Sequence, residues 1–333
     1  MKIENWTQAS EFFSLLYVNR QTAAQMRLAC RHLSELCERP ADLDVLTVAR
    51  FIRRELPRQR STSVRSLLRA IKTIAAKLNA LGVIAVDPFK VQKFVVPYEQ
   101  NLDRSLTLGD VARALRQADA EAADLAAAES LASLRLPTVR GRRSPAWKAR
   151  RLRALLYLLS HTGVRAAEAL HLQPGDLVLR ERDEETGAVY SGVHIRSSKE
   201  HRTKTKASAD VVPLPDAAAG VLLDWLPDCG GVWVFPCSSR PDRPWTSGGP
   251  GQKPYEQLKA LGRRAGCKGS LTLLSQRHTF ATCARTFWRL TRDDVQTILR
   301  HESPEMQTKH YVHARLSELA PMVRGVSYSQ GGA

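Results

Sequence analysis

The stretch Thr162-Gly163-Val164-Arg165-Ala166-Ala167-Glu168-Ala169-Leu170 joins two predicted helices in the C-terminal half of the chain. Before it, leucines recur at three- and four-residue intervals from Leu152 to Leu159, which is the period of a helix with one apolar face. Gly163 is expected to end that helix, because glycine tolerates the left-handed conformation of a helix C-terminus. A second helix restarts at once, and there Arg165 and Glu168 are spaced for an ordinary ion pair.

Short apolar runs on the C-terminal side of this stretch predict strands. These runs are rich in valine and too short for helices, and they cover residues 178–179, 189–190, 193–195, 211–214 and 232–235. Helical patterns return from about Pro254 to the end of the chain. The C-terminal half therefore has the pattern of an α+β domain with a small antiparallel sheet.

The first 94 residues predict an all-helical unit. Apolar side chains recur at helical spacing in three stripes, over residues 22–36, 45–56 and 64–81. The third stripe is the most regular. Ser61-Thr62-Ser63 offers N-cap candidates before it, and Gly82 is a suitable residue to end it.

Changes in composition divide the chain further. We expect a helical unit (1–94), a linker (95–105), a larger domain (106–326) and a disordered tail (327–333). Asp87-Pro88 closes the first unit, and Thr107 is a plausible N-cap where helical periodicity resumes. Residues 119–147 begin alanine-rich and end rich in proline and arginine, so we interpret them as a surface insertion able to touch phosphate.

The charge balance favours a polyanionic partner. The 333 residues include 50 Lys+Arg and 33 Asp+Glu, a net charge of +17, with a pI near 10.0. No apolar run approaches the roughly 20 residues of a membrane-spanning helix, and the N-terminus has no signal-peptide core, which argues against a membrane. A nucleic acid is therefore the expected partner. The helices of the first unit carry a candidate DNA-facing set of basic residues: Arg50, Arg53, Arg54, Arg58, Arg60, Arg65, Arg69, Lys72 and Lys77.

The cysteines indicate a reduced, cytoplasmic protein. The six are scattered: Cys30, Cys37, Cys229, Cys237, Cys267 and Cys283. None belongs to a CxxC pair, so neither a zinc site nor a disulfide framework is indicated.

Four residues of the C-terminal half have side chains suited to phosphodiester chemistry. Breaking such a bond needs a hydroxyl nucleophile and fixed cationic donors for the non-bridging oxygens. Arginine suits the second task because its planar fork binds phosphate bidentately and stays charged. Taken singly, Arg165, Arg277, His301 and Tyr311 each have an ordinary structural interpretation as ion pair, solvated helix face, helix C-terminus or packed aromatic.

Their order and surroundings resemble the tyrosine recombinase family, which includes phage integrases and chromosome-dimer resolvases. Residues 162–170 resemble its first-arginine motif and residues 277–282 its second. Residues 295–301 resemble the helix that delivers a third basic residue, and Tyr311-Val312-His313 resembles the nucleophile segment. The N-terminal unit is similar to the family's core-binding domain. The resemblance implies a SAM-like, all-α core-binding domain followed by a mixed α+β catalytic domain.

The resemblance also implies roles for the matched residues. Arg165 and Arg277 would clamp the scissile phosphate, with His301 donating a third hydrogen bond. Tyr311 would attack the phosphorus, leaving a 3′-phosphotyrosyl link and a free 5′ hydroxyl.

The family's general acid is a lysine on a β-hairpin. Lys204 fits best because it begins a Lys-Thr-x-x-Ser pattern, while Lys206 is a close rival and Lys199 a distant one. The family reaction uses no metal, nucleotide or other cofactor. A zinc interpretation of His301, His310 and His313 lacks any accompanying acidic or cysteine ligand.

Three positions depart from the family pattern. Leu274 stands where a histidine usually precedes the second arginine, so Ser275, His278 or a water would have to take over its role. Tyr311 follows the third basic residue by ten positions where nine is common, which requires a one-residue bulge. Arg300 replaces the glycine that usually precedes the third basic residue.

The leading hypothesis is a site-specific recombinase or integrase that acts on double-stranded DNA as a homo-oligomer, with four protomers on two duplexes. One alternative is a non-catalytic or weakly active DNA-binding relative, in which Leu274 marks a degenerate site. The other is a topoisomerase-like enzyme that uses the same tyrosine chemistry on one duplex. The amphipathic segment 314–322 is expected to dock on a neighbouring protomer or to pack within its own chain.

Overall fold

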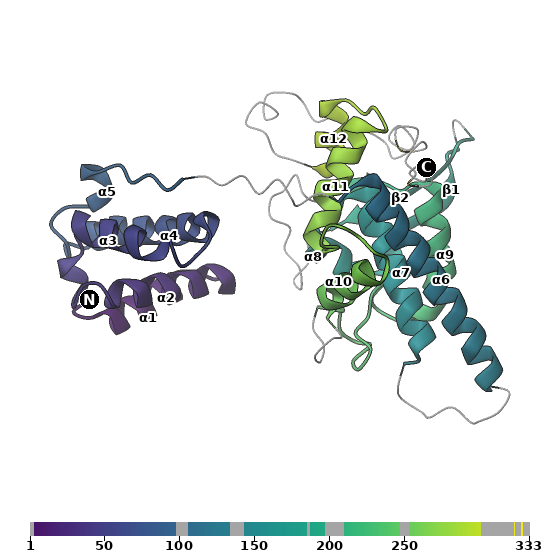
Figure 1. Ribbon diagram of the computed structural model, residues 1–333, viewed down its shortest axis with the longest axis horizontal. Helices are drawn as coiled ribbons and strands as arrows, with labels where there is room; N and C mark the ends of the chain where they lie inside the picture. The colour runs from purple at the N-terminus through teal and green to yellow at the C-terminus, as the bar shows by residue number, and fades with distance from the viewer. Residues whose placement is uncertain are drawn as a thin grey trace. The chain divides into compact units, whose positions relative to one another are not determined.

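The computed structural model describes residues 3–97, 106–133, 143–184, 187–196, 210–246 and 253–300, together with Val323 and Tyr328. The chain divides into two compact units, residues 1–101 and 102–333 (Figure 1). The division falls inside the segment expected to be a linker.

The N-terminal unit is built from helices in its described part. They are α1 (Trp6–Leu15), α2 (Arg20–Ser34), α3 (Val45–Glu55), α4 (Ser61–Ala80) and the short α5 (Pro88–Val91), with a 3-10 turn at Pro40–Asp42. The three predicted stripes become the buried faces of α2, α3 and α4, and Phe51, Ile71 and Leu78 are fully buried among them. α1 was not predicted, although Trp6 and Phe13 pack into the same core.

The ends of these helices follow capping chemistry. The side chains of Asn5, Asn19 and Asp44 accept hydrogen bonds from backbone amides at the starts of α1, α2 and α3. The predicted serine cap of α4 is wrong: Arg60 holds the N-cap position, and Ser61 is already the first residue of the helix. Gly82 follows α4 with φ +70°, as its sequence position predicts.

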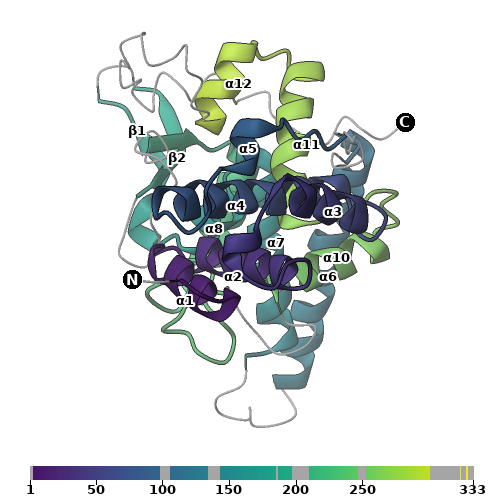
Figure 2. The same cartoon turned by 90° about the vertical axis from the view of Figure 1, so that its left-hand side faces the viewer.

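The C-terminal unit is mainly helical in its described part, and its small sheet packs against two of the helices. Its described helices are α6 (Leu108–Ser133), α7 (Pro145–Thr162), α8 (Ala166–Leu170), α9 (Asp216–Cys229), α10 (Pro254–Arg264), α11 (Leu273–Thr286) and α12 (Arg292–Leu299). α7 is central, because it contacts α6, α9, α10 and α11. Figures 1 and 2 show α12 and the sheet at one end of this unit and the far ends of α6 and α7 at the other.

The sheet has three antiparallel strands in the order β1 (Leu177–Arg182), β2 (Val189–Ile195), β3 (Asp210–Pro213). Two of the predicted apolar runs are parts of one strand, β2. The strand predicted over residues 232–235 is wrong, since the nearest pairing is a single bridge between Pro236 and Pro244. Val234 and Phe235 are apolar there because they are buried in the core.

The surface insertion expected over residues 119–147 is helical over residues 119–133 and 145–147. Its first part continues α6, where the Asp119 carboxylate accepts hydrogen bonds from Arg153 Nε (2.6 Å) and the Tyr157 hydroxyl (2.7 Å) of α7. Its last residue, Trp147, is buried in α7. Alanine has the highest helix propensity, so the alanine-rich composition is itself a helix signal. Residues 134–142, between the two helices, lie outside the described residues.

The prediction of a disordered tail after residue 326 is wrong at Tyr328. This side chain is buried, and its hydroxyl donates a 2.7 Å hydrogen bond to the Ser160 carbonyl. The His161 and Trp288 rings meet it edge-on.

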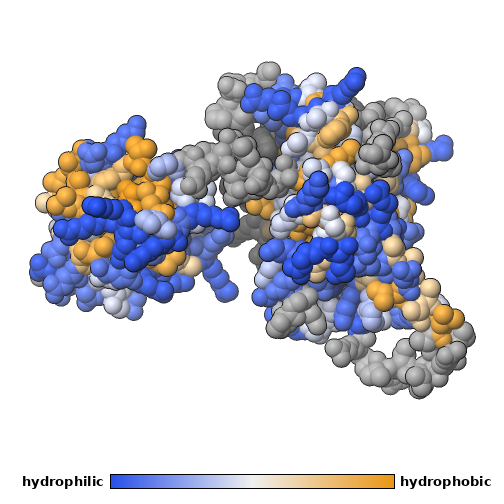
Figure 3. Space-filling view, in the orientation of Figure 1, coloured by the Kyte–Doolittle hydropathy of each residue, from blue (hydrophilic) through white to orange (hydrophobic). Residues whose placement is uncertain are grey.

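The described surface is mixed in polarity, and four of the six cysteines are buried. The face in Figure 3 mixes hydrophobic areas with many hydrophilic side chains, and Leu46, Val86 and Val91 are among the exposed apolar residues of the N-terminal unit. None of the helices in the described ranges is long and apolar enough to cross a membrane. All six cysteines are free thiols, and burial raises the pKa of Cys30 to about 12.

Candidate active site

Gly163 lies at the point where three helices of the site pack together. It ends α7 in the left-handed conformation, with φ +62°, as its sequence position predicts. A Cβ at this position would lie 2.7 Å from Leu299 Cδ2 and 2.7 Å from Phe280 Cδ1. Backbone conformation and space therefore both require glycine, and α7, α11 and α12 meet at this point.

Arg165 stands at the start of α8, where Glu168 fixes it. The backbone N–H of Arg165 donates to Glu168 Oε2 (2.9 Å), and its Nη1 donates to Glu168 Oε1 (2.8 Å). The expected ion pair is thus present, with 30% of the arginine side chain exposed but only 2% of the glutamate side chain. Burial opposes the ionisation of Glu168, but Arg300 and Arg165 outweigh it and lower its pKa.

Arg277 reaches the same place from α11. Its Nη1 donates to the Gly163 carbonyl (2.7 Å) and its Nη2 to the Leu299 carbonyl (2.5 Å). Burial, followed by the charges of Arg165 and Arg300, lowers the Arg277 pKa to about 10. The guanidinium therefore remains protonated at neutral pH.

Arg300 is a member of this cluster that the sequence did not identify as a site residue. It follows α12 with φ +53°, and its side chain is 1% exposed. Its Nη2 donates to Glu168 Oε2 at 2.6 Å. The sequence feature that could have identified Arg300 is its place in the family pattern, where a glycine is usual.

The structure also describes Leu274, which stands in place of the usual histidine, and the two residues that could take over its role, Ser275 and His278. Leu274 is 54% exposed. Ser275 serves the start of α11, because its hydroxyl donates to the Thr272 carbonyl (2.9 Å) and accepts from the Thr272 N–H (2.8 Å). Ser275 is therefore committed to a helix cap, whereas His278 is exposed.

The remaining predicted site residues lie outside the described part of the chain. These are Lys204 and its rivals Lys206 and Lys199, together with His301 and Tyr311. His310 and His313, of the zinc alternative, lie outside it as well. Among the residues that are described, no cluster of three or more His, Cys, Asp or Glu could hold a metal. What the structure brings together is the arginine pair.

A comparison of the sequence with protein-family profiles identifies a family for this chain. The sequence profile of the Phage integrase family matches residues 143–318, more than half of the chain. The chain belongs to the phage integrase family. The match spans both arginines and each of the predicted site residues beyond the described ranges. Among curated protein sequences, none matched the chain.

Solved structures of integrase-family proteins share the fold at low sequence identity. Lambda integrase (residues 75–356) bound to DNA aligns with TM-score 0.61 and 14% identity over 95% of this chain and 96% of that one. A lambda integrase tetramer bound to a Holliday junction aligns with TM-score 0.61 and 14% identity, covering 90% and 76%. XerH site-specific recombinase, in a post-cleavage complex with a palindromic difH substrate, aligns with TM-score 0.59 and 15% identity, covering 90% and 78%. The α+β fold with a helical N-terminal unit is thereby confirmed.

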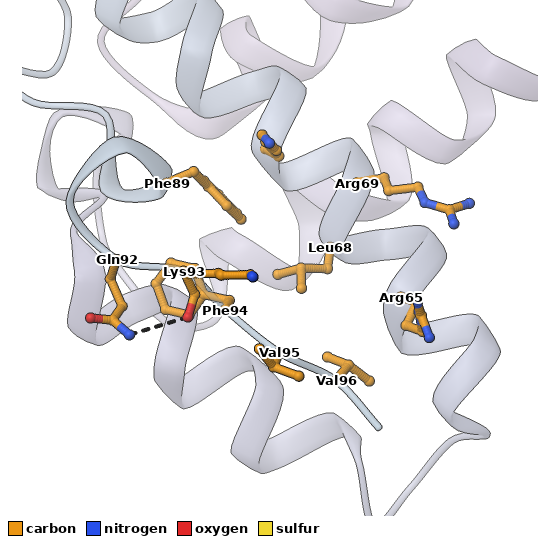
Figure 4. A pocket seen from close by; sticks show the side chains of 10 residues that line it. Arg65, Leu68, Arg69, Phe89, Gln92, Lys93, Phe94, Val95 and Val96 are labelled. Atoms are coloured by element: carbon orange, nitrogen blue, oxygen red, sulfur yellow. Dashed lines mark hydrogen bonds between the residues drawn. The ribbon is translucent and has the colours of Figure 1, made fainter. Parts of the chain in front are cut away.

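The N-terminal unit of this integrase-family chain holds a second candidate site, a groove of about 430 Å³ (Figure 4). Arg65, Arg69 and Lys72 lie at one-turn spacings along α4 and line one side of it. Phe89 and Phe94 line it too, with their rings edge to face at 5.1 Å. A groove lined by both basic and aromatic side chains suits a phosphate-bearing ligand.

Proposed function

We propose that Arg165 and Arg277 are the phosphate clamp of a site-specific DNA recombinase that works through a 3′-phosphotyrosyl intermediate. The observation that supports it most is that two arginines 112 positions apart in sequence lie close enough for the charge of Arg165 to lower the pKa of Arg277, with Arg165 bonded to Glu168 and Arg277 to the Gly163 carbonyl. Hydrogen bonds to Glu168 and to two backbone carbonyls hold both of them in place.

This arrangement fits the charge that develops during strand cleavage. Negative charge grows on the non-bridging oxygens as the phosphorus gains a fifth ligand, and fixed donors stabilise it without reorganising. Arg277 stays charged because its lowered pKa of about 10 is still well above neutral. The Arg165 side chain is accessible to a ligand, since 30% of it is exposed.

The other roles rest on the resemblance. We assign Tyr311 as the nucleophile, whose Oη bonds to phosphorus while the bond from phosphorus to the 5′ oxygen breaks. Lys204 gives its proton to that leaving oxygen, and the tyrosine proton passes to a base or to solvent. His301 donates to the phosphate beside the two arginines. Rejoining reverses these steps with the 5′ hydroxyl of a second strand.

The partner is double-stranded DNA, and the working form is a homo-oligomer. The net charge of +17 and the basic groove of the N-terminal unit support binding to the phosphate backbone. The similar lambda integrase structures include a dimer on a core site and a tetramer on a Holliday junction. We extend this to a tetrameric assembly of the present chain, acting in the cytoplasm.

A suicide substrate tests the proposal. A duplex carrying the repeats that flank the encoding locus, with a nick that releases a short fragment after cleavage, traps the covalent adduct. We expect the wild-type chain to form an adduct seen on a denaturing gel, and Tyr311→Phe to abolish it. Tyr328→Phe is the matched control, because Tyr328 is buried against Ser160 and should not be the nucleophile.

The same assay separates the alternatives. Absence of any wild-type adduct would favour a degenerate site, for which the exposed Leu274 is the structural hint. Adduct with relaxed plasmid but no recombinant product would favour a topoisomerase-like enzyme. Recombinant product between two sites supports the recombinase.

A further inference from the structure

Arg300 combines two features that disfavour an arginine. Its backbone has φ +53°, a conformation that glycine adopts without strain and that other residues seldom adopt. Its long charged side chain is 1% exposed, although arginine is rarely buried without a partner. A residue kept under both conditions is expected to contribute through its side chain.

The Arg300 side chain and Arg165 both donate hydrogen bonds to the Glu168 carboxylate. Arg300 Nη2 lies 2.6 Å from Oε2, the oxygen that also accepts the backbone N–H of Arg165 at 2.9 Å. The other oxygen, Oε1, accepts Arg165 Nη1 at 2.8 Å. Each oxygen is thus assigned to a donor, which fixes the rotation of the carboxylate and the direction in which it holds Arg165.

The same turn also holds the second arginine of the clamp. Arg277 donates to the carbonyl of Leu299, the residue directly before Arg300. A continuous chain of contacts therefore runs from Arg277 through Leu299 and Arg300 to Glu168 and Arg165. Arg300 is the link in it that joins α12 to α8.

We propose that Arg300 is a positioning residue, which orients Arg165 toward the scissile phosphate by fixing the Glu168 carboxylate. The inference rests on the proposed function of the two clamp arginines. Arg300 does not touch the phosphate itself, because its guanidinium is buried and engaged with Glu168. A glycine would relax the backbone at this position but would leave Glu168 Oε2 with the backbone donor of Arg165 and without this second cation.

The first test needs no activity. In protein labelled with ¹⁵N-arginine, the Arg165 Nε–H signal is assigned by its loss in Arg165→Ala. We expect Arg300→Met to shift that signal and to lower its order parameter, and Arg300→Lys to restore part of the order, since lysine supplies the charge without the fork. Arg289→Met is the matched control, because Arg289 is exposed and has a similar φ of +57°. An Arg165 signal unchanged in a folded Arg300→Met protein would overturn the inference.

The second test measures single-turnover adduct formation on the nicked duplex. Arg300→Met should slow cleavage by about 100-fold while half-site affinity stays within about 2-fold, because a small misplacement of a clamp group costs rate rather than binding. Arg300→Lys should recover part of the rate. In an Arg165→Ala background, Arg300→Met should cause no further loss, since its effect passes through Arg165. Additive losses, or a loss seen only in affinity, would refute the positioning role.

The two tests fail separately. If the wild-type chain forms no adduct but the Arg165 signal responds to Arg300→Met, the positioning role stands and the proposed recombinase function fails. If the adduct forms but the losses at Arg165 and Arg300 add, the function stands and the positioning role fails. A thermal melt of each variant checks folding, and Arg300→Lys carries the test if Arg300→Met unfolds.

Discussion

Replacing Gly163 by alanine should destabilise the C-terminal unit through two separable effects. The first is conformational: a residue with a Cβ pays about 1–2 kcal/mol in the left-handed region that Gly163 occupies. The second is steric, because the new Cβ would lie 2.7 Å from side-chain atoms of both Phe280 and Leu299. Overpacking of that kind costs about 1–3 kcal/mol. The expected loss is therefore about 2–5 kcal/mol, and at about 3 kcal/mol the melting temperature of a unit this size falls by roughly 6–12 °C.

Differential scanning calorimetry of the full chain measures this loss, with Gly266→Ala as the control. Gly266 has nearly the same φ, +65°, but a Cβ there meets nothing within 4 Å, so it should lose only the conformational part. The difference between the two variants isolates the packing of α11 and α12 against the end of α7. Equal losses for Gly163→Ala and Gly266→Ala would refute the close packing at this turn.

Three further predictions concern other parts of the molecule. Burial lowers the His161 pKa to about 4, so on acidification the unfolded chain takes up a proton on this imidazole before the folded chain does. The free energy of unfolding should therefore fall by up to about 3 kcal/mol between pH 6.5 and pH 4. His161→Phe should flatten the plot of urea midpoint against pH in this range, and an unchanged slope would contradict the prediction. Tyr328→Phe should cost about 1 kcal/mol in urea unfolding through loss of the bond to Ser160, whereas no loss would place Tyr328 elsewhere in solution. Arg69→Ala should weaken DNA binding and reduce the slope of log K against log salt by about one in fluorescence anisotropy, and an unchanged slope would exclude Arg69 from phosphate contact.

The fold was predictable where local pattern and burial coincide. The stripes of α2, α3 and α4 became buried faces, and Gly82 and Gly163 ended helices in the left-handed conformation. The errors arose where an apolar or alanine-rich run had two explanations. Residues 232–235 are apolar because the core covers them, not because they pair in a sheet. Residues 119–133 extend a helix that the later prolines had obscured.

The candidate site was predictable in its residue types but not in its connections. Arg165 and Glu168 are three positions apart, so their pairing follows from helical geometry. The partners of Arg277 are backbone carbonyls, one of them 114 positions away, and no spacing in the sequence indicates them. The Arg300 contact with Glu168 joins segments 132 positions apart and likewise depends on the packing of the whole unit.

The hydrogen bonds of Arg277 also limit what can replace it. Two of the five N–H donors of its guanidinium serve the Gly163 and Leu299 carbonyls, so the plane of the group is set by the chain before DNA arrives. A lysine offers three donors on a freely rotating head and has no plane to set. Retaining the charge at this position would thus preserve the attraction for DNA while losing the angle at which the phosphate is met.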